Sequence, residues 1–384
     1  MILGCIGFMF GTGGGALIAV ALGEKKEGKA NEIFTQNILV SSVIGIILAI
    51  LGIIFLPGIS SLLGADGQLL SDSVAYGRII LISLPFYILQ FQFQCLFSTA
   101  QKPQIGLFVT VSAGCANIVL DALFVGAFRW GLYGAAAATS ISQFIGGFIP
   151  LVYFARQNGS LLHFCRFSFD RKVLVRTCTN GSSEFLSNVS MSLVSMLYNA
   201  QLLKYAGENG IAAYGVLMYV GMIFQAIFIG YSVGSSPIVS YHYGAGNTDE
   251  LRNLKRRGFG IIITTAVLMF ASSELFGSTL ARAFVGYDAQ LLEITAHAFV
   301  IFSFSFLFSG ISILGSSFFT ALNDGLTSAL ISFLRTLVFQ VAAVLIFPLI
   351  LGLDGIWLSI VAAEVMSVIA TVIFLILKQK KYQY

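Results

Sequence analysis

Charged residues are scarce in this sequence. Only 10% of its 384 residues are Asp, Glu, Lys or Arg, whereas 57% are apolar, and soluble domains carry about 25% charged residues. A chain with so few charges cannot cover a water-facing surface. The composition therefore excludes a soluble globular domain and predicts an integral membrane protein. The net charge of +4 comes from scattered residues and indicates no nucleic-acid partner.

Several chemical motifs are also missing. The five cysteines include no Cys-x-x-Cys pair and the three histidines are far apart, so neither a disulfide framework nor a zinc site is expected. No Gly-x-x-x-x-Gly-Lys-Ser/Thr loop occurs, which excludes a P-loop ATPase. We expect no cofactor and no enzymatic activity. An intramembrane enzyme stays as a remote alternative, because it would need a nucleophile or metal set near the membrane edge.

Long apolar runs dominate what is present. They have helical-span length and lack alternating polarity, which favours helices over a lipid-embedded barrel. The sequence thus predicts an all-α membrane protein with about 11 transmembrane helices. The predicted spans are residues 2–22, 33–56, 75–98, 104–127, 132–154, 173–204, 210–241, 258–281, 291–320, 326–350 and 355–377.

Most of the 21 Lys and Arg residues fall in one alternating set of loops. This set includes Lys25, Lys102, Arg171, Arg256 and Lys380. Because cytoplasmic loops carry an excess of Lys and Arg, these loops and the C-terminus are predicted to be cytoplasmic. We expect a multi-pass protein of the cell membrane, surrounded by lipid bilayer and monomeric.

The chain contains an internal repeat. "GTGGGALIAVALGEKKEG" from residue 11 is echoed by "GYSVGSSPIVSYHYGAGN" from residue 230, and "FSTAQK" from 97 by "FFTALN" from 318. The copies lie about 221 residues apart with matching orientation, as in transporters built from parallel repeats. The repeat predicts an N-terminal lobe of five helices (1–154), a cytoplasmic inter-lobe linker (155–172) and a C-terminal lobe of six helices (173–384).

The first copy has no counterpart of the helix at 173–204. Two pseudo-symmetric lobes of six helices would make twelve, so the first helix is predicted to be absent. No basic n-region of a cleavable signal peptide explains this start. We expect an N-truncated gene product or a wrongly chosen start codon, and a transport-inactive truncated product stays open as an alternative.

Several motifs together resemble the multidrug and toxic compound extrusion (MATE) family: "FSTAQKPQIGL", "NIVLDALFV", "GLYGAAAATSISQ" and "GSSPIVSYHYGAGN". The resemblance covers essentially the whole chain apart from the absent first helix. It implies two lobes facing a central cavity. It also implies a secondary active antiporter that exports lipophilic, amphipathic or cationic drugs in exchange for H⁺ or Na⁺, with a role in antibiotic resistance.

Asn117 and Asp121 lie four residues apart, hence on one helix face, inside an apolar run. A carboxylate at the bilayer centre costs about 2.5–3.5 kcal/mol, so a function is expected to offset it. With Thr139 on the next helix, these side chains offer oxygen ligands for Na⁺ or a proton-accepting carboxylate. The resemblance to the MATE family places the N-lobe cation site on the same three residues. A structural carboxylate, satisfied by neighbouring helices, is the alternative.

Glu184 lies inside the predicted span 173–204, with Asn180 and Asn188 four residues before and after it. Met191 continues this face. Such a stripe must face protein or a watery cavity. The resemblance to the MATE family implies that carboxylates on this helix serve coupling or substrate binding, so Glu184 is a candidate for proton coupling and its neighbours for a substrate cavity. A structural hydrogen-bonded acid is the alternative.

Four further polar residues lie within spans. Gln90 and Gln94 occupy one face of a Phe-rich helix, where they either line the cavity or bond neighbouring helices. Arg335 and Glu364 each lie about ten residues into adjacent spans. They are predicted to form a structural ion pair across the last hairpin.

Overall fold

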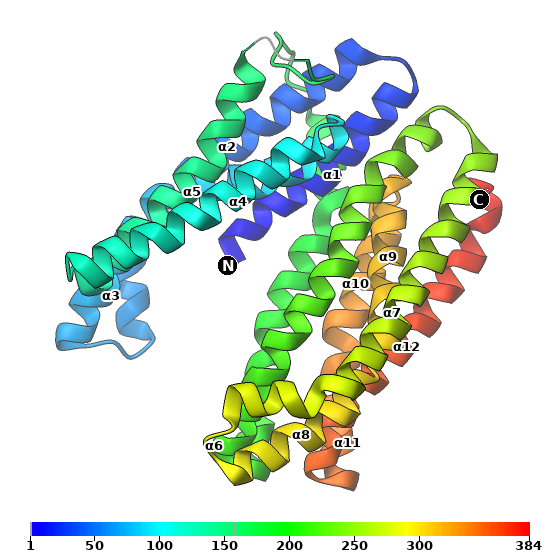
Figure 1. Cartoon of the computed structure of the whole chain (residues 1–384). Helices are drawn as coiled ribbons and strands as arrows, with labels where there is room; N and C mark the ends of the chain where they lie inside the picture. Colours follow the sequence, from blue (N-terminus) through cyan, green and yellow to red (C-terminus); the bar gives the residue numbers. More distant parts are fainter. Residues whose placement is uncertain (1, 157–158) are drawn as a thin grey trace. The chain divides into compact units, whose positions relative to one another are not determined.

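The computed structural model describes residues 2–156 and 159–384, and these ranges contain helices joined by short connections, with no strand (Figure 1). The predicted all-α class is confirmed. The α-helices are α1 (Cys5–Gly23), α2 (Glu27–Leu62), α3 (Gly67–Thr99), α4 (Pro103–Asp121), α5 (Gly131–Ala155), α6 (Arg171–Gly244), α7 (Thr248–Val285), α8 (Ala289–Ser303), α9 (Phe306–Ala321), α10 (Gly325–Phe333), α11 (Phe339–Leu351) and α12 (Leu353–Tyr382). Two π-helical segments, η2 (Ala122–Ala127) and η3 (Leu334–Val338), and a short 3₁₀ turn, η1 (Ile2–Gly4), complete the set.

The predicted spans correspond to these helices. Within the described ranges, nine helices are long and apolar enough to cross a membrane, or ten if the bent pair α8–α9 counts as one span. Helix α6 contains two predicted spans, which the non-helical Gly207 (φ +64°) separates. The predicted span 291–320 is bent by 50° between α8 and α9.

Contacts divide the chain into two compact units, Met1–Gly181 and Ser182–Tyr384. We call them the N-unit and the C-unit. The division falls inside α6, whereas the sequence predicted a boundary at the linker 155–172. The first turns of α6 belong to the N-unit because α1 packs closely on them: a Cβ atom at Gly181 would clash with the backbone carbonyl of Met9.

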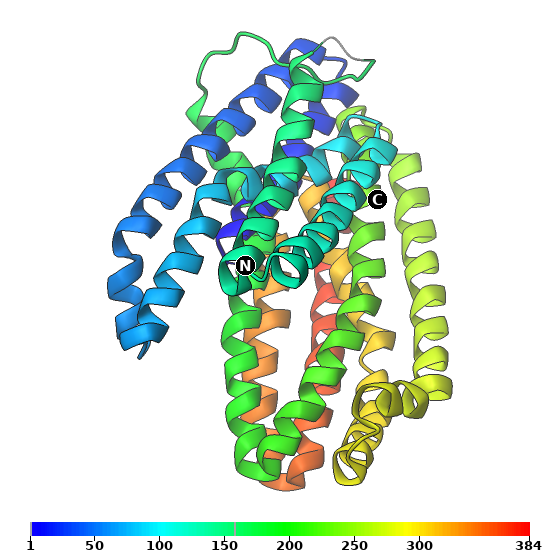
Figure 2. The same cartoon turned by 60° about the vertical axis from the view of Figure 1, so that its left-hand side comes forward.

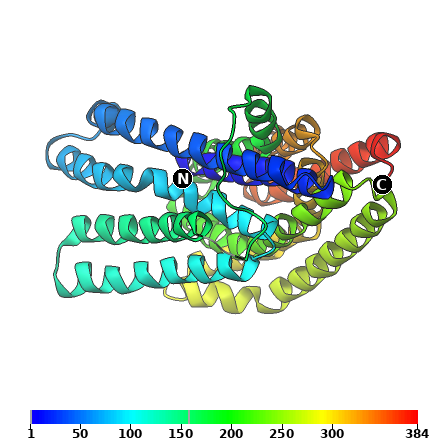
Figure 3. The same ribbon diagram turned by 90° about the horizontal axis from the view of Figure 1, so that it is seen from above.

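In the N-unit, α3 packs against α1, α2 and α5, and α4 packs against α5. Figure 3 shows α2 beside α3 and α4 beside α5. The core is aromatic: the Phe154 ring stacks on Phe93 with centroids 5.6 Å apart and lies 5.1 Å from both Phe34 and Phe97. These rings are almost fully buried, and such pairs contribute about 0.5–1.5 kcal/mol beyond their burial.

The extended segment 159–170 is held along α2 by buried polar side chains. The backbone amide of His163 donates to Asn31 Oδ1 (2.9 Å), and that of Cys165 donates to Thr35 Oγ1 (3.1 Å). Asn31 and Thr35 lie one helical turn apart and are 3% and 4% exposed. They satisfy backbone groups of a segment that lacks its own secondary structure. Residues 157 and 158 of the predicted linker lie outside the described residues.

In the C-unit, the two halves of α6 return on one another at Gly207, as the green helices in Figure 2 show. Helix α9 packs against α7, α10 and α12, and α11 packs against α12. The core gathers aromatic side chains from several helices, among them the fully buried Tyr198, Phe299, Phe302 and Trp357. This core holds the chamber described below.

The turn between α9 and α10 is anchored by Asp324. Its carboxylate accepts hydrogen bonds from the Thr327 amide (3.3 Å) and the Tyr382 hydroxyl (2.8 Å) and pairs with Lys378 Nζ at 3.2 Å. Burial alone would raise the pKa of Asp324, but the hydrogen bonds from Tyr382, Thr327 and Lys378 outweigh it and lower the pKa. Asp324 therefore caps α10 and ties it to the end of α12.

The contact between α1 and α6 predicts a large effect of side chains at Gly181. Gly181→Leu should destabilise the N-unit by about 1–3 kcal/mol, because the added atoms meet backbone that has no room to move. Gly114→Leu, on an open face of α4, is the matched control and should leave the melting temperature within about 2 °C of the parent. Thermal unfolding in detergent measures both, and equal melting temperatures would contradict the described packing.

The contacts of Asp324 predict a contribution to stability that depends on pH. Its lowered pKa means that the stabilisation is present above the unfolded pKa of about 3.9 and is lost as pH falls through the folded value. Asp324→Ala should cost about 1 kcal/mol near neutral pH through the lost helix cap. The difference from the parent should shrink below pH ~4. A difference that is constant with pH in thermal unfolding would rule out the ionised anchor.

Candidate functional site

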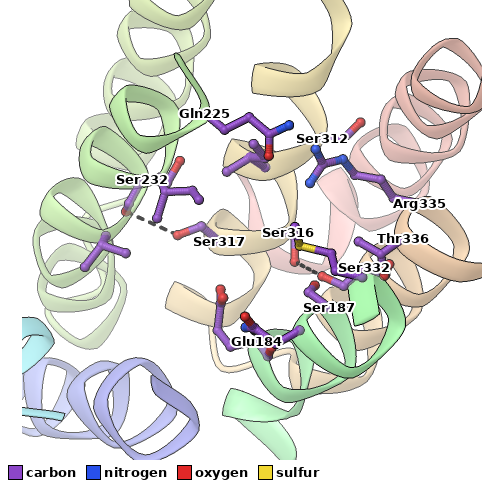
Figure 4. A pocket seen from close by; sticks show the side chains of 15 residues that line it. Glu184, Ser187, Gln225, Ser232, Ser312, Ser316, Ser317, Ser332, Arg335 and Thr336 are labelled. Carbon is purple, nitrogen blue, oxygen red and sulfur yellow. Dashed lines mark hydrogen bonds between the residues drawn. The ribbon is translucent and has the colours of Figure 1, made fainter. Parts of the chain in front are cut away.

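A polar chamber lies inside the C-unit. It consists of two adjoining cavities of about 120 and 190 Å³, which share Met191, Gln225, Arg335 and Thr336 in their walls. We call the two together the C-unit chamber. The smaller cavity (Figure 4) is also lined by Glu184, Ser187, Asn188, Ile229, Ser232, Val233, Ser312, Ile313, Ser316, Ser317 and Ser332. The larger cavity is also lined by Val194, Ser195, Tyr198, Tyr214, Met218, Phe302, Ser305, Gln340, Ile360 and Glu364.

Glu184 projects from α6 into the smaller cavity (Figure 4). Within the described ranges its carboxylate accepts no hydrogen bond and forms no ion pair; the amide of Asn188 donates to its backbone carbonyl instead (2.8 Å). The positive charge of Arg335 attracts this carboxylate. An acid without a direct partner, in an apolar span and beside a chamber, can bind a proton or a cation there.

Arg335 and Glu364, which lie in adjacent predicted spans, form an ion pair. Arg335 Nε lies 3.1 and 3.0 Å from the two carboxylate oxygens of Glu364, and Nη2 lies 2.9 Å from Oε1. The side chains are 14% and 6% exposed. A fork of this kind fixes the geometry and offsets the desolvation of both charges. Because both residues line the larger cavity, the pair also borders the chamber.

Hydroxyl groups from α9 and α10 satisfy one another on the chamber wall. Ser316 Oγ lies 2.9 Å from Ser328 Oγ and 2.8 Å from Ser332 Oγ, and Ser328 also donates to the Ser316 carbonyl (2.8 Å). Small side chains allow the two helices to approach closely. Ser316 and Ser332 line the smaller cavity and give it a neutral, hydrogen-bonding wall, whereas Ser328 is fully buried.

The larger cavity has an aromatic side. The rings of Tyr198 and Tyr214 are stacked, with centroids 5.4 Å apart and planes at 6°. The Tyr198 hydroxyl donates to Gln340 Oε1 (2.7 Å) and lies 2.8 Å from Ser359 Oγ. These contacts fix a flat apolar surface beside the ion pair. Such a surface suits an aromatic ligand.

The three residues of the predicted N-lobe cation site are placed at the end of α4 and on α5. Within the described part of the chain, no hydrogen bond or ion pair joins Asn117, Asp121 and Thr139. Asn117 Nδ2 is buried without a hydrogen-bond partner there. The π-helical segment η2 begins directly after Asp121, and π-helical turns often mark functional positions. A Na⁺ site at these residues stays a prediction.

The other candidate residues are divided between the units. Asn188 and Met191 line the chamber with Glu184, whereas Asn180 is buried in the part of α6 that belongs to the N-unit. In α3, Gln90 packs against Gly146 of α5, and Gln94 is exposed. Neither glutamine lines the chamber.

The hydroxyl wall and the aromatic side of the chamber were not predicted from the sequence. A signal was present: Ser312, Ser316 and Thr320 repeat every four residues, as do Ser328, Ser332 and Thr336. Such stripes place hydroxyls on one face of each helix. The stripes alone do not distinguish a packing seam from a chamber wall.

Apolar helical spans in two compact units, with an unpaired acid beside a polar chamber, define a polytopic membrane protein of the transporter class. The model of the MatE family matches residues 1–123 and 184–346. The chain belongs to this family.

Two multidrug export proteins are similar to almost the whole chain. The multidrug export protein MepA of Staphylococcus haemolyticus (strain JCSC1435) is 27% identical over 368 residues, which cover 94% of this chain and 80% of the relative. MepA of Staphylococcus saprophyticus is 25% identical over 378 residues, covering 97% and 82%. A solved structure of a multidrug resistance MATE family transporter in the outward-facing conformation superposes with a TM-score of 0.94 at 20% identity, covering 100% of this chain and 86% of that one. The two-lobed helical fold predicted from the repeat is thereby confirmed.

The ion pair predicts an asymmetry between single and double substitutions. Arg335→Gln or Glu364→Gln alone should destabilise the C-unit by about 3–5 kcal/mol, because each leaves one buried charge without its partner. The double variant removes both charges and should recover most of that loss. Thermal unfolding in detergent measures the three variants. Additive losses in the double variant would show that the two charges are not coupled.

Proposed function

We propose that this chain is a secondary active exporter of amphipathic and cationic compounds, driven by exchange with H⁺ or Na⁺. The observation that carries the proposal is the Glu184 carboxylate, which lies within an apolar span, lacks a hydrogen-bond partner among the described residues and lines the chamber. The similarity to two MepA multidrug export proteins supports the substrate class.

The exchange follows from competition for one carboxylate. A proton or Na⁺ bound at Glu184 neutralises the charge that a cationic substrate would pair with, so the two occupy the chamber in turn. Each ligand then favours the conformation that binds it better. A membrane potential adds about 2.3 kcal/mol per charge per 100 mV to such an exchange.

We also propose a second coupling position at Asp121 with Asn117 and Thr139. Their side-chain oxygens can bind a cation, and a π-helical segment begins directly after Asp121.

The excess of Lys and Arg in one set of loops supports a cell-membrane protein with a cytoplasmic C-terminus. No feature of the described residues calls for a partner protein, and the chain is proposed to act as a monomer.

Efflux assays test the proposal. Cells that express the chain should expel ethidium when a Na⁺ or pH gradient is imposed. Glu184→Gln and Asp121→Asn should each reduce gradient-driven efflux at least about tenfold at unchanged expression, since the neutral amides cannot exchange a proton or pair with a cation. Glu293→Gln, exposed on α8, is the control and should retain efflux. Gradient-driven efflux that persists in Glu184→Gln would remove this acid from the mechanism, and no efflux by the parent chain would remove the function.

A further inference from the structure

The start of α6 carries exposed basic side chains without acidic partners. Arg171, Lys172 and Arg176 lie in its first two turns, and Arg166 lies in the extended segment that precedes it. All four side chains are exposed. Within residues 2–156 and 159–384, none of them forms an ion pair. This part of the N-unit therefore presents uncompensated positive charge.

The acid that directly precedes α6, Asp170, is already engaged. Its Oδ1 accepts hydrogen bonds from the backbone amides of Lys172 (2.8 Å) and Val173 (3.4 Å), and its Oδ2 lies 3.7 Å from Lys29 Nζ. The hydrogen bond from the Lys172 amide is the largest cause that lowers the pKa of Asp170. Positive side chains near the first turn of a helix are disfavoured by the helix dipole. A negative group from outside the chain would therefore stabilise this end of α6.

Buried polar contacts fix the backbone that carries these charges. Gln36 of α2, which is 2% exposed, donates from Nε2 to the Asp170 carbonyl (2.9 Å) and accepts from the Asp170 amide (3.0 Å). On the opposite face of α6, Val173 and Thr177 are buried, and Thr177 Oγ1 donates to Asn37 Oδ1 (3.3 Å). Because the backbone is already ordered, a ligand of the basic side chains would not have to order it.

Apolar side chains are exposed among the charges. Phe169 is 59% exposed and Val175 is 52% exposed. Val175 lies four residues after Arg171, so both occupy one face of α6. The predicted apolar span 173–204 begins at the same place, which puts these side chains at the edge of the membrane. Basic and apolar side chains exposed together at that edge are typical of contacts with lipid headgroups.

We propose that this surface binds the headgroups of anionic phospholipids. We call it the linker patch, and it consists of Arg166, Phe169, Arg171, Lys172, Val175 and Arg176. The guanidinium groups donate to lipid phosphate, and the ammonium group of Lys172 adds a point charge. Phe169 and Val175 contact the apolar region below the headgroups, a contact that a soluble phosphate does not offer. Lipid binding at the linker patch is independent of the proposed export function.

Lipid titration of the purified full chain in detergent, followed by native mass spectrometry, tests the proposal. Phosphatidylglycerol should bind at least about tenfold more tightly than phosphatidylcholine with the same acyl chains. Arg171→Gln/Lys172→Gln should lower the affinity for phosphatidylglycerol about tenfold or more and leave that for phosphatidylcholine within about twofold. Lys26→Gln/Arg252→Gln is the matched control, because it removes two charges that already pair with Glu24 and Asp249. It should keep the parent affinities within about twofold.

A substitution of the exposed ring separates the apolar contact from the charges. Phe169→Ser should weaken both lipids several-fold and leave the ratio of their affinities unchanged, since the ring contacts the part that the two lipids share. The substituted side chains are exposed, so each variant should melt within about 2 °C of the parent without added lipid.

Three results would overturn the proposal. The first is equal affinity of the parent chain for the two lipids. The second is an equal loss of phosphatidylglycerol binding in the patch variant and its matched control. The third is displacement of phosphatidylglycerol by about 10 mM inorganic phosphate, at ionic strength held constant with NaCl, which would identify a site for soluble phosphate.

Discussion

The cost of charge inside apolar helices is the constraint on which the C-unit depends. Arg335 and Glu364 offset that cost by a forked ion pair with both side chains largely buried. Glu184, on another helix, has no such partner among the described residues and instead faces a chamber walled by hydroxyls. The same physical rule thus produces two results: a neutral pair that fixes the helices, and an acid without a direct partner beside the chamber, which we propose exchanges its ligand.

Local distortions of helices accompany the ionisable groups in both units. The π-helical segment η2 follows Asp121, and η3 contains Arg335. These segments occur in corresponding helices of the repeat, although not at corresponding residues. A π-helical turn widens the helix and changes the direction of the next side chains. In both helices, an ionisable residue therefore lies in or directly before an irregular turn.

Much of the fold could be predicted from the sequence because span length and apolar runs are set by the bilayer. The repeat at "FSTAQK" and "FFTALN" indicated two lobes. The bend between α8 and α9 could not be predicted, since it depends on tertiary packing around an apolar sequence with no proline.

Less of the candidate site than of the fold could be predicted from the sequence. Arg335 and Glu364 were recognisable because opposite charges at similar depth in adjacent spans must pair. The hydroxyl wall that includes Ser316 and Ser332 was not, because serines occur in packing seams and chamber walls alike.

A direct test of the account is proton release when the permanent cation tetraphenylphosphonium binds, measured by calorimetry in buffers of different ionisation enthalpy between about pH 5 and 8. If proton and substrate share Glu184, the parent chain releases up to about one proton per bound cation and Glu184→Gln releases none. Binding that neither releases a proton at any pH nor is weakened by Na⁺, or unchanged proton release in the variant, would contradict the account.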